Sequence, residues 1–591
     1  MTIFAGILSR GDAGPIEDAA CASVQGALTR HPADRPRVFR SGRIFFAKVD
    51  VGAYREEAFC AQPSGSVSML AGEPLLDRGD SSHPESRTAD LESLHRSWDQ
   101  GDFSGLSRSS GVFAAAHYDP QSETLSLIAD KLGIRPLYVW LSERLVVFAS
   151  ALRILEGVDL VTKEMDVRGV VELVSLGYSL GPRTPYSKIL MLGPGEVLRI
   201  SGPTVASSRY WRWDAIPVSD KPEPALLAEA HRRFSLGMRR RQRGDTGAVA
   251  FLSGGLDSRC IVSELRAQGV NVRTFNFARP GLQDQIFAAR FAQEVGTIHY
   301  QSPHGHPIRP NLSMVLARAW DPQTQPASSH VERPHFVWSG DGGSVGVGHV
   351  YMSRAVVDLL RQGRVAIAVD RFLAERGAGL HRRLYRGDVS ARLAGLLQRG
   401  IREELAGIHS PDPARDFHIF LMHTDQHRHL FHHFEDIDLH RMEFQLPFFD
   451  SSFLEVILSA PIDACLGHRF YMRWLSRFPS VALSVPWQAY PGHEPCPLPV
   501  DDVLPTQWDR ARNREELRAE RSAYLRMADE VLASREFPKP LLSKAALRML
   551  SWLYRARWRD YRYAISAAQT FQRYWAISKG KYVLGEAPSD S

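Results

Sequence analysis

The stretch S-G-G-L-D-S at residues 253–258 decides the fold of the central part of this chain. The apolar run A-V-A-F-L at 248–252 comes directly before it, and the segment 259–268 after it is typical of a helix. A buried strand that turns through glycines into a helix leaves consecutive amide N–H groups facing outward at the positive end of the helix dipole. The stretch therefore predicts a phosphate-binding loop.

The residue types of this loop suit a nucleotide. Gly254 and Gly255 allow a tight backbone path. Ser253 and Ser258 carry hydroxyl donors, and Asp257 suits a magnesium ion that neutralises a triphosphate. We therefore expect ATP and Mg²⁺ here, with a glycine-rich turn that binds no ligand as the alternative. The stretch matches neither GxxxxGK[ST] nor GxGxxG, which disfavours a Walker NTPase and a dinucleotide-binding fold.

Segments beyond the loop continue to alternate between strand and helix. Residues 272–277 are apolar and strand-like, and residues 284–295 have helical periodicity. This order predicts an α/β domain with a parallel, doubly wound sheet. Helices dominate residues 350–480, so the same domain is expected to have a helical C-terminal part.

The first 215 residues have a different pattern. Short apolar runs such as 43–49 and 112–118 are separated by Gly, Pro, Asp and Ser, as in packed antiparallel sheets. A proline-containing linker at 217–224 follows, and an Arg- and aromatic-rich helical segment begins near residue 505. We therefore expect three parts, at residues 1–215, 216–504 and 505–591.

Composition is that of an ordinary globular protein, with 44% hydrophobic and 23% charged residues. With no long apolar run and no signal-peptide pattern, we expect no membrane association and a cytoplasmic location. The five cysteines are scattered without a CxxC pair, and His423 and His427 lack an HExxH context, so metal sites are disfavoured at both. A formal charge of +6 is mild for 591 residues, and no nucleic-acid partner is expected.

The SGGLDS loop resembles the pyrophosphate-binding loop of the asparagine synthetase and ATP-pyrophosphatase superfamily. Members of that superfamily cleave ATP between its α and β phosphates and convert a carboxylate into an acyl-adenylate. Three further stretches resemble the family's in order and spacing, namely T-F-N-F at 274–277, S-G-D-G-G at 339–343 and E-F-Q-L-P-F-F-D at 443–450. The first of these implies that the strand around Phe275 contacts adenine.

The second glycine loop departs from the family's S-G-D-G-x-D-E. Ser344 stands where the family has the later Asp that helps hold magnesium. Gly340 and Gly342 remain as parts of the nucleotide site, and Asp341 remains as a second magnesium ligand beside Asp257. The alternative for Asp341 is an aspartate in an ordinary glycine turn.

The resemblance implies that three residues act on the substrate. Glu443 falls where the family carries an acidic residue that helps deprotonate the attacking amine, and a plain ion-pair role is the alternative. Arg469 matches a K-x-x-L-R pattern and would balance pyrophosphate or position the substrate, with a solvated helix face as the alternative. The family's later Lys, which stabilises the adenylation transition state, has no counterpart here, and Tyr490 or His493 would substitute.

Residues 1–215 resemble the glutaminase domain of class B asparagine synthetases, notably in D-K-L-G-I-R-P-L-Y at 130–138. The resemblance implies an α+β fold, an Ntn-hydrolase-like antiparallel sheet sandwich. The family's nucleophile is a cysteine directly after the initiator Met, where this chain has Thr2. Ala71 replaces the oxyanion-stabilising Asn, and the substrate-gripping Arg is missing near Lys48. We therefore expect a retained scaffold without glutaminase activity.

A domain of this kind beside an adenylating domain favours an amine that the substrate itself carries. β-Lactam synthetases and the macrolactam-forming cyclases of lasso peptide biosynthesis share this arrangement, and Arg259 and the basic C-terminal extension resemble the latter. That resemblance implies adenylation of an Asp or Glu side chain in a precursor peptide and attack by its N-terminal amine. A leader peptidase and a leader-binding protein would be partners. The alternatives are an amide ligase for another metabolite or glycan, and an inactive nucleotide-binding scaffold.

Overall fold

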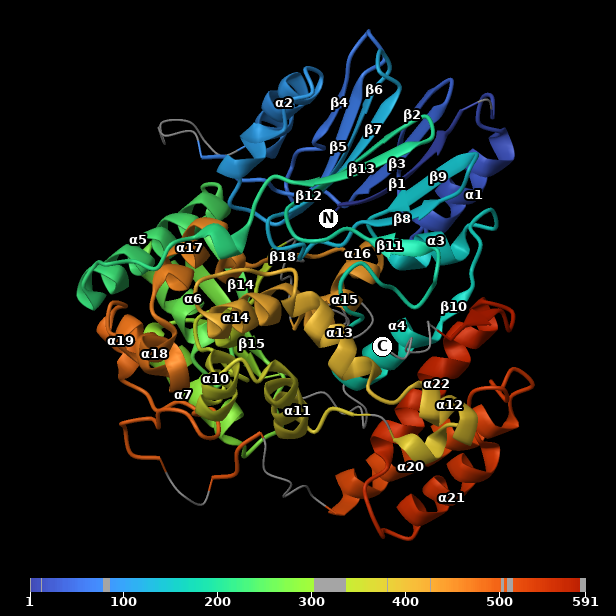
Figure 1. The fold of residues 1–591 in the computed structure, drawn as a ribbon. Helices are drawn as coiled ribbons and strands as arrows, with labels where there is room; N and C mark the ends of the chain where they lie inside the picture. The colour runs from blue at the N-terminus through green and yellow to red at the C-terminus, as the bar shows by residue number, and fades with distance from the viewer. Residues whose placement is uncertain are drawn as a thin grey trace, which may run out of the picture.

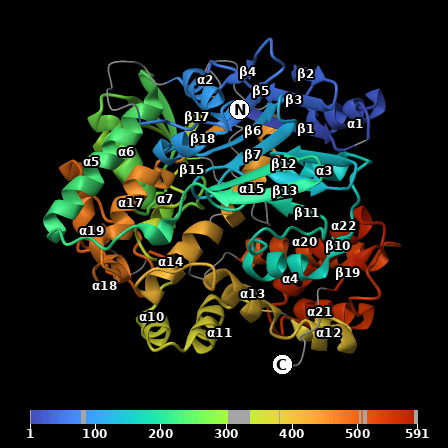
Figure 2. The same cartoon turned by 45° about the horizontal axis from the view of Figure 1, so that its top comes forward.

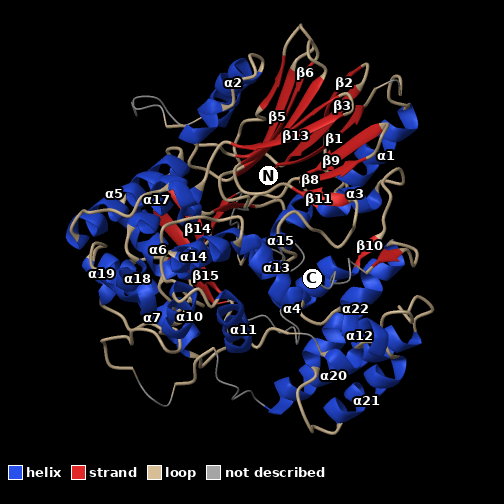
Figure 3. Cartoon of the chain, in the orientation of Figure 1, coloured by secondary structure: helices blue, strands red, loops and turns tan. Residues whose placement is uncertain are grey.

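A computed structural model describes this chain at residues 2–11, 13–77, 86–301, 336–379, 381–425, 427–500, 504–507 and 514–584. Within these residues it contains an antiparallel sheet sandwich, a parallel sheet with surrounding helices, and a helical C-terminal segment (Figures 1 and 3). Among the helices described, none combines the length and the apolar character that crossing a membrane requires.

Two six-stranded antiparallel sheets form the N-terminal part. The first has the order β11-β8-β9-β1-β3-β2 and the second the order β13-β12-β7-β6-β5-β4. The first sheet contains Thr2–Ser9 (β1), Arg37–Ser41 (β2), Ile44–Asp50 (β3), Tyr138–Leu141 (β8), Leu145–Ala149 (β9) and Ile189–Met191 (β11). The second contains Phe59–Ala61 (β4), Val67–Gly72 (β5), Phe113–Asp119 (β6), Thr124–Ala129 (β7), Glu196–Ser201 (β12) and Thr204–Arg209 (β13).

The two sheets pack face to face because side chains alternate along each strand. Phe4 and Phe46 of the first sheet lie in one buried cluster with Ala114 and Leu127 of the second. Helices cover the outer faces of the sheets: α1 (Asp18–Leu28) and α3 (Leu152–Gly157) pack on the first sheet, and α2 (Arg87–Trp98) packs on the second. The predicted antiparallel sandwich is confirmed.

A five-stranded parallel sheet forms the centre of the next part, with the order β16-β15-β14-β17-β18. Chain order reverses at β14, since β15 and β16 follow on one side and β17 and β18 on the other. Ligands of such sheets bind at the carboxyl ends of the strands where the order reverses, and SGGLDS directly follows β14. The predicted parallel, doubly wound sheet is confirmed. Its strands are Gly247–Phe251 (β14), Asn271–Asn276 (β15), Ile298–Gln301 (β16), Phe336–Trp338 (β17) and Glu443–Gln445 (β18).

Helices surround this sheet and extend beyond it. Those before β17 are Glu223–Gln242 (α5), Asp257–Ala267 (α6) and Gln283–Val295 (α7), whereas Val167–Leu176 (α4) belongs to the N-terminal part of the chain. Between β17 and β18 lie Gly343–Gly346 (α9), Arg354–Arg361 (α10), Val365–Arg376 (α11), Gly387–Arg392 (α12), Leu396–Leu405 (α13), Pro413–Thr424 (α14), His427–Glu435 (α15) and Ile437–His440 (α16). Ser451–Ser459 (α17), Ile462–Cys465 (α18) and Arg469–Leu475 (α19) follow. The helical C-terminal part of this domain is therefore present as predicted.

The C-terminal segment folds back onto the N-terminal part of the chain (Figure 2). Its last strand, β19, pairs in parallel with β10, and the ring of Tyr574 meets that of Tyr186 edge to face at 5.6 Å. The elements concerned are Arg514–Ala533 (α20), Lys544–Arg555 (α21), Arg562–Ile577 (α22), Tyr582–Val583 (β19) and Met165–Asp166 (β10). The segment is helical as predicted, but its pairing with β10 was not foreseen.

Candidate functional site

The loop after β14 is held by its own hydroxyl groups. The Ser253 N–H donates to Ser258 Oγ at 2.9 Å, and the two serine hydroxyls lie 3.0 Å apart. The Gly255 N–H donates to Ser253 Oγ at 3.2 Å. These bonds close the loop into a compact turn directly before α6, so its remaining polar groups sit at the positive end of that helix.

Gly254 occupies a position that excludes any side chain. A Cβ atom there would lie 2.6 Å from Asp284 Cα, on the helix that follows the next strand. Its N–H donates to Asp284 Oδ1 at 3.0 Å, and the Asn276 side chain donates to the same oxygen at 2.9 Å. The first glycine of the motif is therefore needed for close contact between neighbouring strand–helix units.

The second glycine loop packs directly against Asp257. A Cβ atom on Gly340 would lie 2.9 Å from Asp257 Cβ, and one on Gly343 would lie 2.5 Å from Asp257 Cγ. Gly342 has a φ of 95°, which favours glycine, and its α-carbon faces the Phe449 ring. The structure thus brings together the two loops that the sequence placed more than 80 residues apart.

Asp257 accepts a hydrogen bond on each carboxylate oxygen. Tyr471 donates to Oδ1 and Ser344 donates to Oδ2, both at 2.6 Å. Burial raises the pKa of Asp257 to about 6; these two hydroxyls oppose that rise, and the negative charge of Asp341 adds to it. Asp257 thus has hydroxyl partners and a neighbouring carboxylate but no cation among the groups that shift its pKa.

The surroundings of Asp257 fit a magnesium ion. Asp341, which accepts from the Ser339 hydroxyl at 2.6 Å, is close enough to raise the pKa of Asp257. Two carboxylates that repel one another, among hydroxyl oxygens, form the hard oxygen donor set that Mg²⁺ prefers. Asp257 and Asp341 would hold the ion.

Tyr471 is a site residue that sequence reasoning missed. It lies on α19, 214 residues beyond Asp257, and its only sequence signal is its place between Arg469 and Arg473. Ser344, read from the sequence as a lost carboxylate, is in fact a hydrogen-bond donor to the carboxylate that remains.

Phe275 lies in the strand beside the loop, as expected. Its carbonyl accepts from the Leu252 N–H at 2.9 Å, and its ring stacks on Tyr300 at 4.9 Å. The ring is thus part of the core of the sheet, and the proposed backbone contact with adenine stays a prediction.

A cleft of about 940 Å³ contains both Arg469 and Tyr490. The Arg469 guanidinium donates to the carbonyls of Leu466 and Asp463, which fixes its position at the start of α19. The same helix carries Tyr471 two residues later, and the Gln488 N–H, two residues before Tyr490, donates to the Gly254 carbonyl at 2.8 Å. Arg469 and Tyr490 therefore each lie two residues in sequence from a residue that contacts the phosphate loop.

Glu443 does not line this cleft in the structure. Its side chain is buried and pairs with Arg135 of the N-terminal sandwich, and it borders a cavity of about 10 Å³ between the two parts of the chain. One carboxylate oxygen, Oε2, has no hydrogen-bond partner among the described residues. Of the three residues predicted to act on the substrate, Arg469 and Tyr490 come together and Glu443 lies at the contact with the N-terminal part.

Thr2 is buried within a cluster of charged side chains. Its hydroxyl donates to Asp50 at 2.9 Å and accepts from Arg87 at 3.1 Å. Arg87 also pairs with Asp50 and lies over the Tyr54 ring. The Lys48 ammonium lies 3.9 Å from the same carboxylate. Side chains of this chain therefore surround the position at which the related glutaminases carry their nucleophile.

Arg135 joins the two regions. Its guanidinium donates to the Thr2 carbonyl at 2.6 Å and forms the ion pair with Glu443. Both members of this pair are almost fully buried. A cavity needs roughly 10–15 Å³ to hold one water, so the space of about 10 Å³ beside this pair is at the lower limit for a single molecule.

Comparison with known protein families gives two matches. A family described as a glutamine amidotransferase domain matches residues 78–211, and one described as asparagine synthase matches residues 230–305. The first falls within the antiparallel sandwich and the second covers the phosphate loop and the strand that follows it.

Curated relatives are similar over part of the chain. The chain is 24% identical over 249 residues to asparagine synthetase [glutamine-hydrolyzing] 3 of Bacillus subtilis, covering 40% of each protein. It is 29% identical over 203 residues to a putative asparagine synthetase [glutamine-hydrolyzing] of Mycobacterium bovis, covering 33% of this chain and 31% of that one. These matches span less than half of each relative.

Two solved structures align with the chain at low TM-scores. One is titled as the structure of the allosteric regulatory enzyme of purine biosynthesis, with 12% identity, a TM-score of 0.24, and coverage of 52% of this chain and 82% of that one. The other is glutamine phosphoribosylpyrophosphate amidotransferase from B. subtilis, with 13% identity, a TM-score of 0.23, and coverage of 64% and 80%. Along the chain, a region similar to a glutamine amidotransferase domain is thus followed by a region similar to asparagine synthase.

Proposed function

We propose that this chain is an ATP-dependent amide ligase that forms AMP and takes its amine from its own substrate. The observation that carries this proposal is the environment of Asp257. Two glycine loops enclose it at the point where the strand order reverses, and among the described residues its partners are hydroxyl groups rather than a counterion. A carboxylate so placed is suited to a cation that arrives with a nucleotide.

The proposed chemistry has two steps. A substrate carboxylate oxygen attacks the α-phosphorus of ATP and pyrophosphate leaves, which gives an acyl-adenylate. The amine nitrogen then attacks the acyl carbon, an amide forms, AMP leaves, and the amine gives up a proton to water or to a nearby base. The loop amides and the hydroxyls of Ser253 and Ser258 would bind the departing pyrophosphate. Magnesium, held by Asp257 and Asp341, would neutralise its charge.

Glutamine hydrolysis is not part of this proposal. The position of the glutaminase nucleophile is occupied by Thr2, whose hydroxyl is bonded to Asp50 and Arg87. The buried pair of Arg135 and Glu443 lies between this position and the adenylating part, beside a cavity of about 10 Å³. These contacts favour an amine that enters with the substrate rather than ammonia made inside the chain.

A precursor peptide is the substrate that we propose. The cleft of about 940 Å³ that contains Arg469 and Tyr490 lies near the upper end of the usual range for ligand sites, roughly 300–1,000 Å³, and so has room for several residues. Arg354 and Arg469 provide positive charge at its wall, and Tyr351 and Tyr490 provide aromatic surface. An Asp or Glu side chain of the peptide would be adenylated there, and the peptide's N-terminal amine would close a macrolactam, as in lasso peptide cyclases.

Holding both ends of one peptide in this cleft would aid the second step. Reactions between groups held together in one complex avoid the entropy cost of a bimolecular encounter, which is worth about 7–11 kcal/mol in well-oriented cases. The acid's position in the peptide would then decide the ring size.

Partner proteins are proposed to bind the C-terminal helices. Trp558 is 80% exposed, Trp552 64% and Tyr563 54%, and these are large aromatic side chains to leave in water. A leader peptidase or a leader-binding protein is the proposed partner for this surface. Trp558→Ser with Trp552→Ser should weaken co-purification of such a partner while leaving turnover of a leader-free peptide unchanged; unchanged co-purification would refute this surface.

The decisive experiment supplies ATP, magnesium and a candidate precursor peptide to the full chain. We expect pyrophosphate and AMP to appear in equal amounts and the peptide to lose one water, as measured by mass spectrometry. Glutamine should not be consumed. Release of glutamate in step with product would contradict the proposal that the substrate supplies the amine.

A nucleotide-binding scaffold is the second candidate, and one observation favours it. The family's later magnesium ligand is Ser344 here, which donates a hydrogen bond to Asp257 instead of contributing a charge. Such a scaffold would bind Mg·ATP without cleaving it. Exchange of labelled pyrophosphate into ATP in the presence of an acid substrate separates the two, because only a ligase catalyses it.

A further inference from the structure

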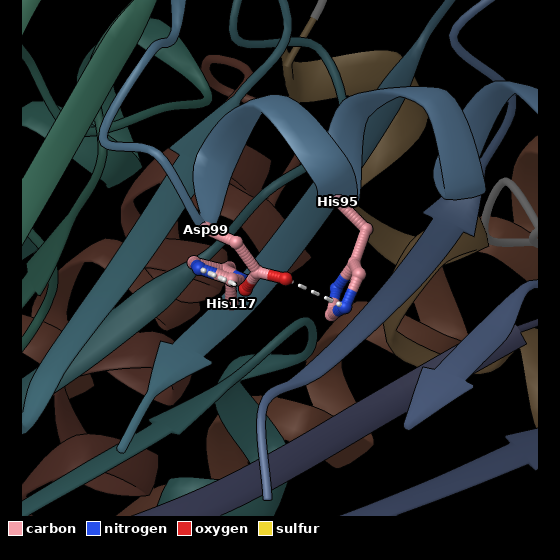
Figure 4. Close-up of side chains that lie close together, drawn as sticks. All are labelled: His95, Asp99 and His117. Carbon is pink, nitrogen blue, oxygen red and sulfur yellow. Dashed lines mark ion pairs between the residues drawn. The ribbon is translucent and has the colours of Figure 1, made fainter. Parts of the chain in front are cut away.

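Three ligand-type side chains meet on the outer face of the second sheet, away from the phosphate loop. Figure 4 shows His95 on helix α2, Asp99 at the end of that helix and His117 on strand β6 pointing toward one another. One ligand atom from each lies within 4.8 Å of the others, and no other such group of three occurs among the described residues. Both histidines are buried and the aspartate is exposed.

The spacing between these atoms suits a zinc ion. His95 Nε2 lies 3.3 Å from Asp99 Oδ2, and His117 Nε2 lies 3.6 Å from Asp99 Oδ1. Bonds of about 2.0–2.2 Å in a tetrahedral zinc site place neighbouring ligand atoms about 3.3–3.6 Å apart. Each distance is therefore close to the length of one edge of the required tetrahedron, and the two end on different oxygens of the Asp99 carboxylate.

Ser68 orients both imidazole rings. Its hydroxyl oxygen lies 2.7 Å from His95 Nδ1 and 2.9 Å from His117 Nδ1. When that oxygen accepts from both Nδ1–H groups, each ring keeps its lone pair on Nε2, the atom that faces Asp99. Histidines that bind metals almost always donate their other ring N–H to such a partner.

Two further observations indicate a site rather than ordinary packing. His117 Nε2 is buried and has no hydrogen-bond partner among the described residues, although it points to a carboxylate. Ser66 donates to Asp99, which holds that carboxylate over the two rings.

We infer that His95, Asp99 and His117 form a zinc site. His95 and His117 would each bind through Nε2 and Asp99 through its carboxylate, with a water as the fourth ligand. The ion would enter from solvent along Asp99, whose side chain is 33% exposed. It would join the end of α2 to strand β6 and so fasten that helix to the sheet beneath it. This role is independent of the ATP site.

Zinc binding to the full chain tests this inference. After treatment with a chelator, titration with Zn²⁺ should show one tight site per chain, and Co²⁺ should give the intense visible absorption of a tetrahedral site. Asp99→Asn should weaken zinc binding more than tenfold, because it removes the charged ligand. Ser68→Ala should weaken it by roughly 10–100-fold through loss of the ring orientation.

The control is Glu92→Gln, an exposed carboxylate on the same helix that is not one of the three ligand residues. It should bind zinc as the unmodified chain does. Circular dichroism of Asp99→Asn checks that an exposed substitution leaves the fold intact, and His95→Gln provides a second ligand variant. The inference is overturned if the unmodified chain binds no zinc, or if Asp99→Asn and His95→Gln both bind it unchanged.

Discussion

Two aspartates, each beside a hydroxyl group, define the contrast between the two halves of this molecule. Asp50 lies next to Thr2 in the N-terminal sandwich, and Asp257 lies next to Ser344 in the parallel-sheet part. Burial alone raises the pKa of Asp50, but the positive charges around it, that of the Arg87 guanidinium first, together outweigh burial and lower the pKa to about 2. Burial raises the pKa of Asp257 to about 6, against its two hydroxyl partners.

The difference lies in where the counterion comes from. Arg87 and Lys48 supply positive charge to Asp50 from within the chain, so that site is complete without a ligand. Asp257 has Tyr471 and Ser344 instead, which donate hydrogen bonds without bringing charge. A buried carboxylate without a cation is costly unless a ligand brings one. The surroundings of Asp50 thus resemble an ordinary buried ion pair, whereas those of Asp257 resemble a ligand-binding site.

The largest effect is expected from Asp257→Asn. Loss of this charge removes a magnesium ligand and should lower the rate of pyrophosphate exchange by roughly 10²–10³, the range found when one electrostatic stabiliser is removed. Stability should change little, because the amide oxygen can accept from one of the two hydroxyls while the amide N–H donates to the other. Asp358→Asn, an exposed change on α10, serves as the control and should leave exchange unchanged. Full activity in Asp257→Asn would remove the basis of the proposed nucleotide site.

Arg87→Leu should have the next largest effect, on stability rather than on activity. It leaves the largely buried Asp50 without its closest guanidinium, with Lys48 still at 3.9 Å, and loss of one partner from a buried pair costs about 3–5 kcal/mol. The free energy of unfolding in urea measures this loss. Arg37→Leu breaks an exposed pair with Glu57 and should cost less than about 1 kcal/mol. Equal losses in the two variants would mean that Arg87 does not neutralise Asp50 in the way described.

Local sequence patterns predicted the surroundings of Asp257, because the phosphate loop and its neighbours are marked by short motifs. SGGLDS, its flanking strand and helix, and the second glycine loop were all visible as short motifs, and the parallel sheet then brings Asp341 near Asp257. The antiparallel sandwich followed from short apolar runs and from a family resemblance. In both cases the signal lies within a few residues of the feature that it predicts.

Long-range pairing was outside the reach of sequence patterns. Tyr471 reaches Asp257 from 214 residues away, and Arg87 reaches Thr2 from a helix that no motif marked. The motif at 443–450 marked Glu443 as a candidate site residue, but its ion-pair partner Arg135 lies 308 residues earlier in the chain. Side-chain partners of this kind depend on how sheets and helices pack, which no periodicity encodes.

The proposed zinc site also depends on residues that are distant in sequence. His95 and Asp99 stand at i, i+4 on one helix face, which is a weak signal on its own. His117 joins them only because β6 runs beneath α2 in the folded chain. In the sequence, the histidines with a spacing typical of metal ligands were His423 and His427. A metal site there was disfavoured because the HExxH context is missing.

Buried imidazoles without a counterion should make stability depend on pH. Burial lowers the pKa of His349 to about 4, against an ordinary value of 6.5. Between these values the unfolded chain binds more protons than the folded one, so this stability is present above pH 6.5 and is lost as pH falls toward 4. One such group contributes at most about 1.4 kcal/mol per pH unit in this window.

The variant His349→Asn isolates this contribution. Asparagine tolerates the positive φ of 53° at this position and does not titrate, so the slope of unfolding free energy against pH should fall by up to about 1.4 kcal/mol per unit. Urea unfolding at several pH values between 4 and 7 measures the slope. His409→Asn, an exposed change, should leave it unchanged. An unaltered slope in His349→Asn would mean that this ring takes up its proton without unfolding.

The smallest expected effect, none at all, belongs to Thr2→Cys. A thiol in place of the hydroxyl supplies the nucleophile that the related glutaminases use, yet Arg87 and Asp50 still bond to this position and the Arg135 guanidinium still holds the Thr2 carbonyl. No glutamate should form from glutamine in a coupled assay, even after the initiator Met is removed. Thr2→Ser is the control for the change in size. Measurable glutamine hydrolysis by Thr2→Cys would show that the N-terminal site lacks only its nucleophile and is not closed by the charged side chains around it. The difference between Asp50 and Asp257 would then no longer distinguish a buried core from a binding site.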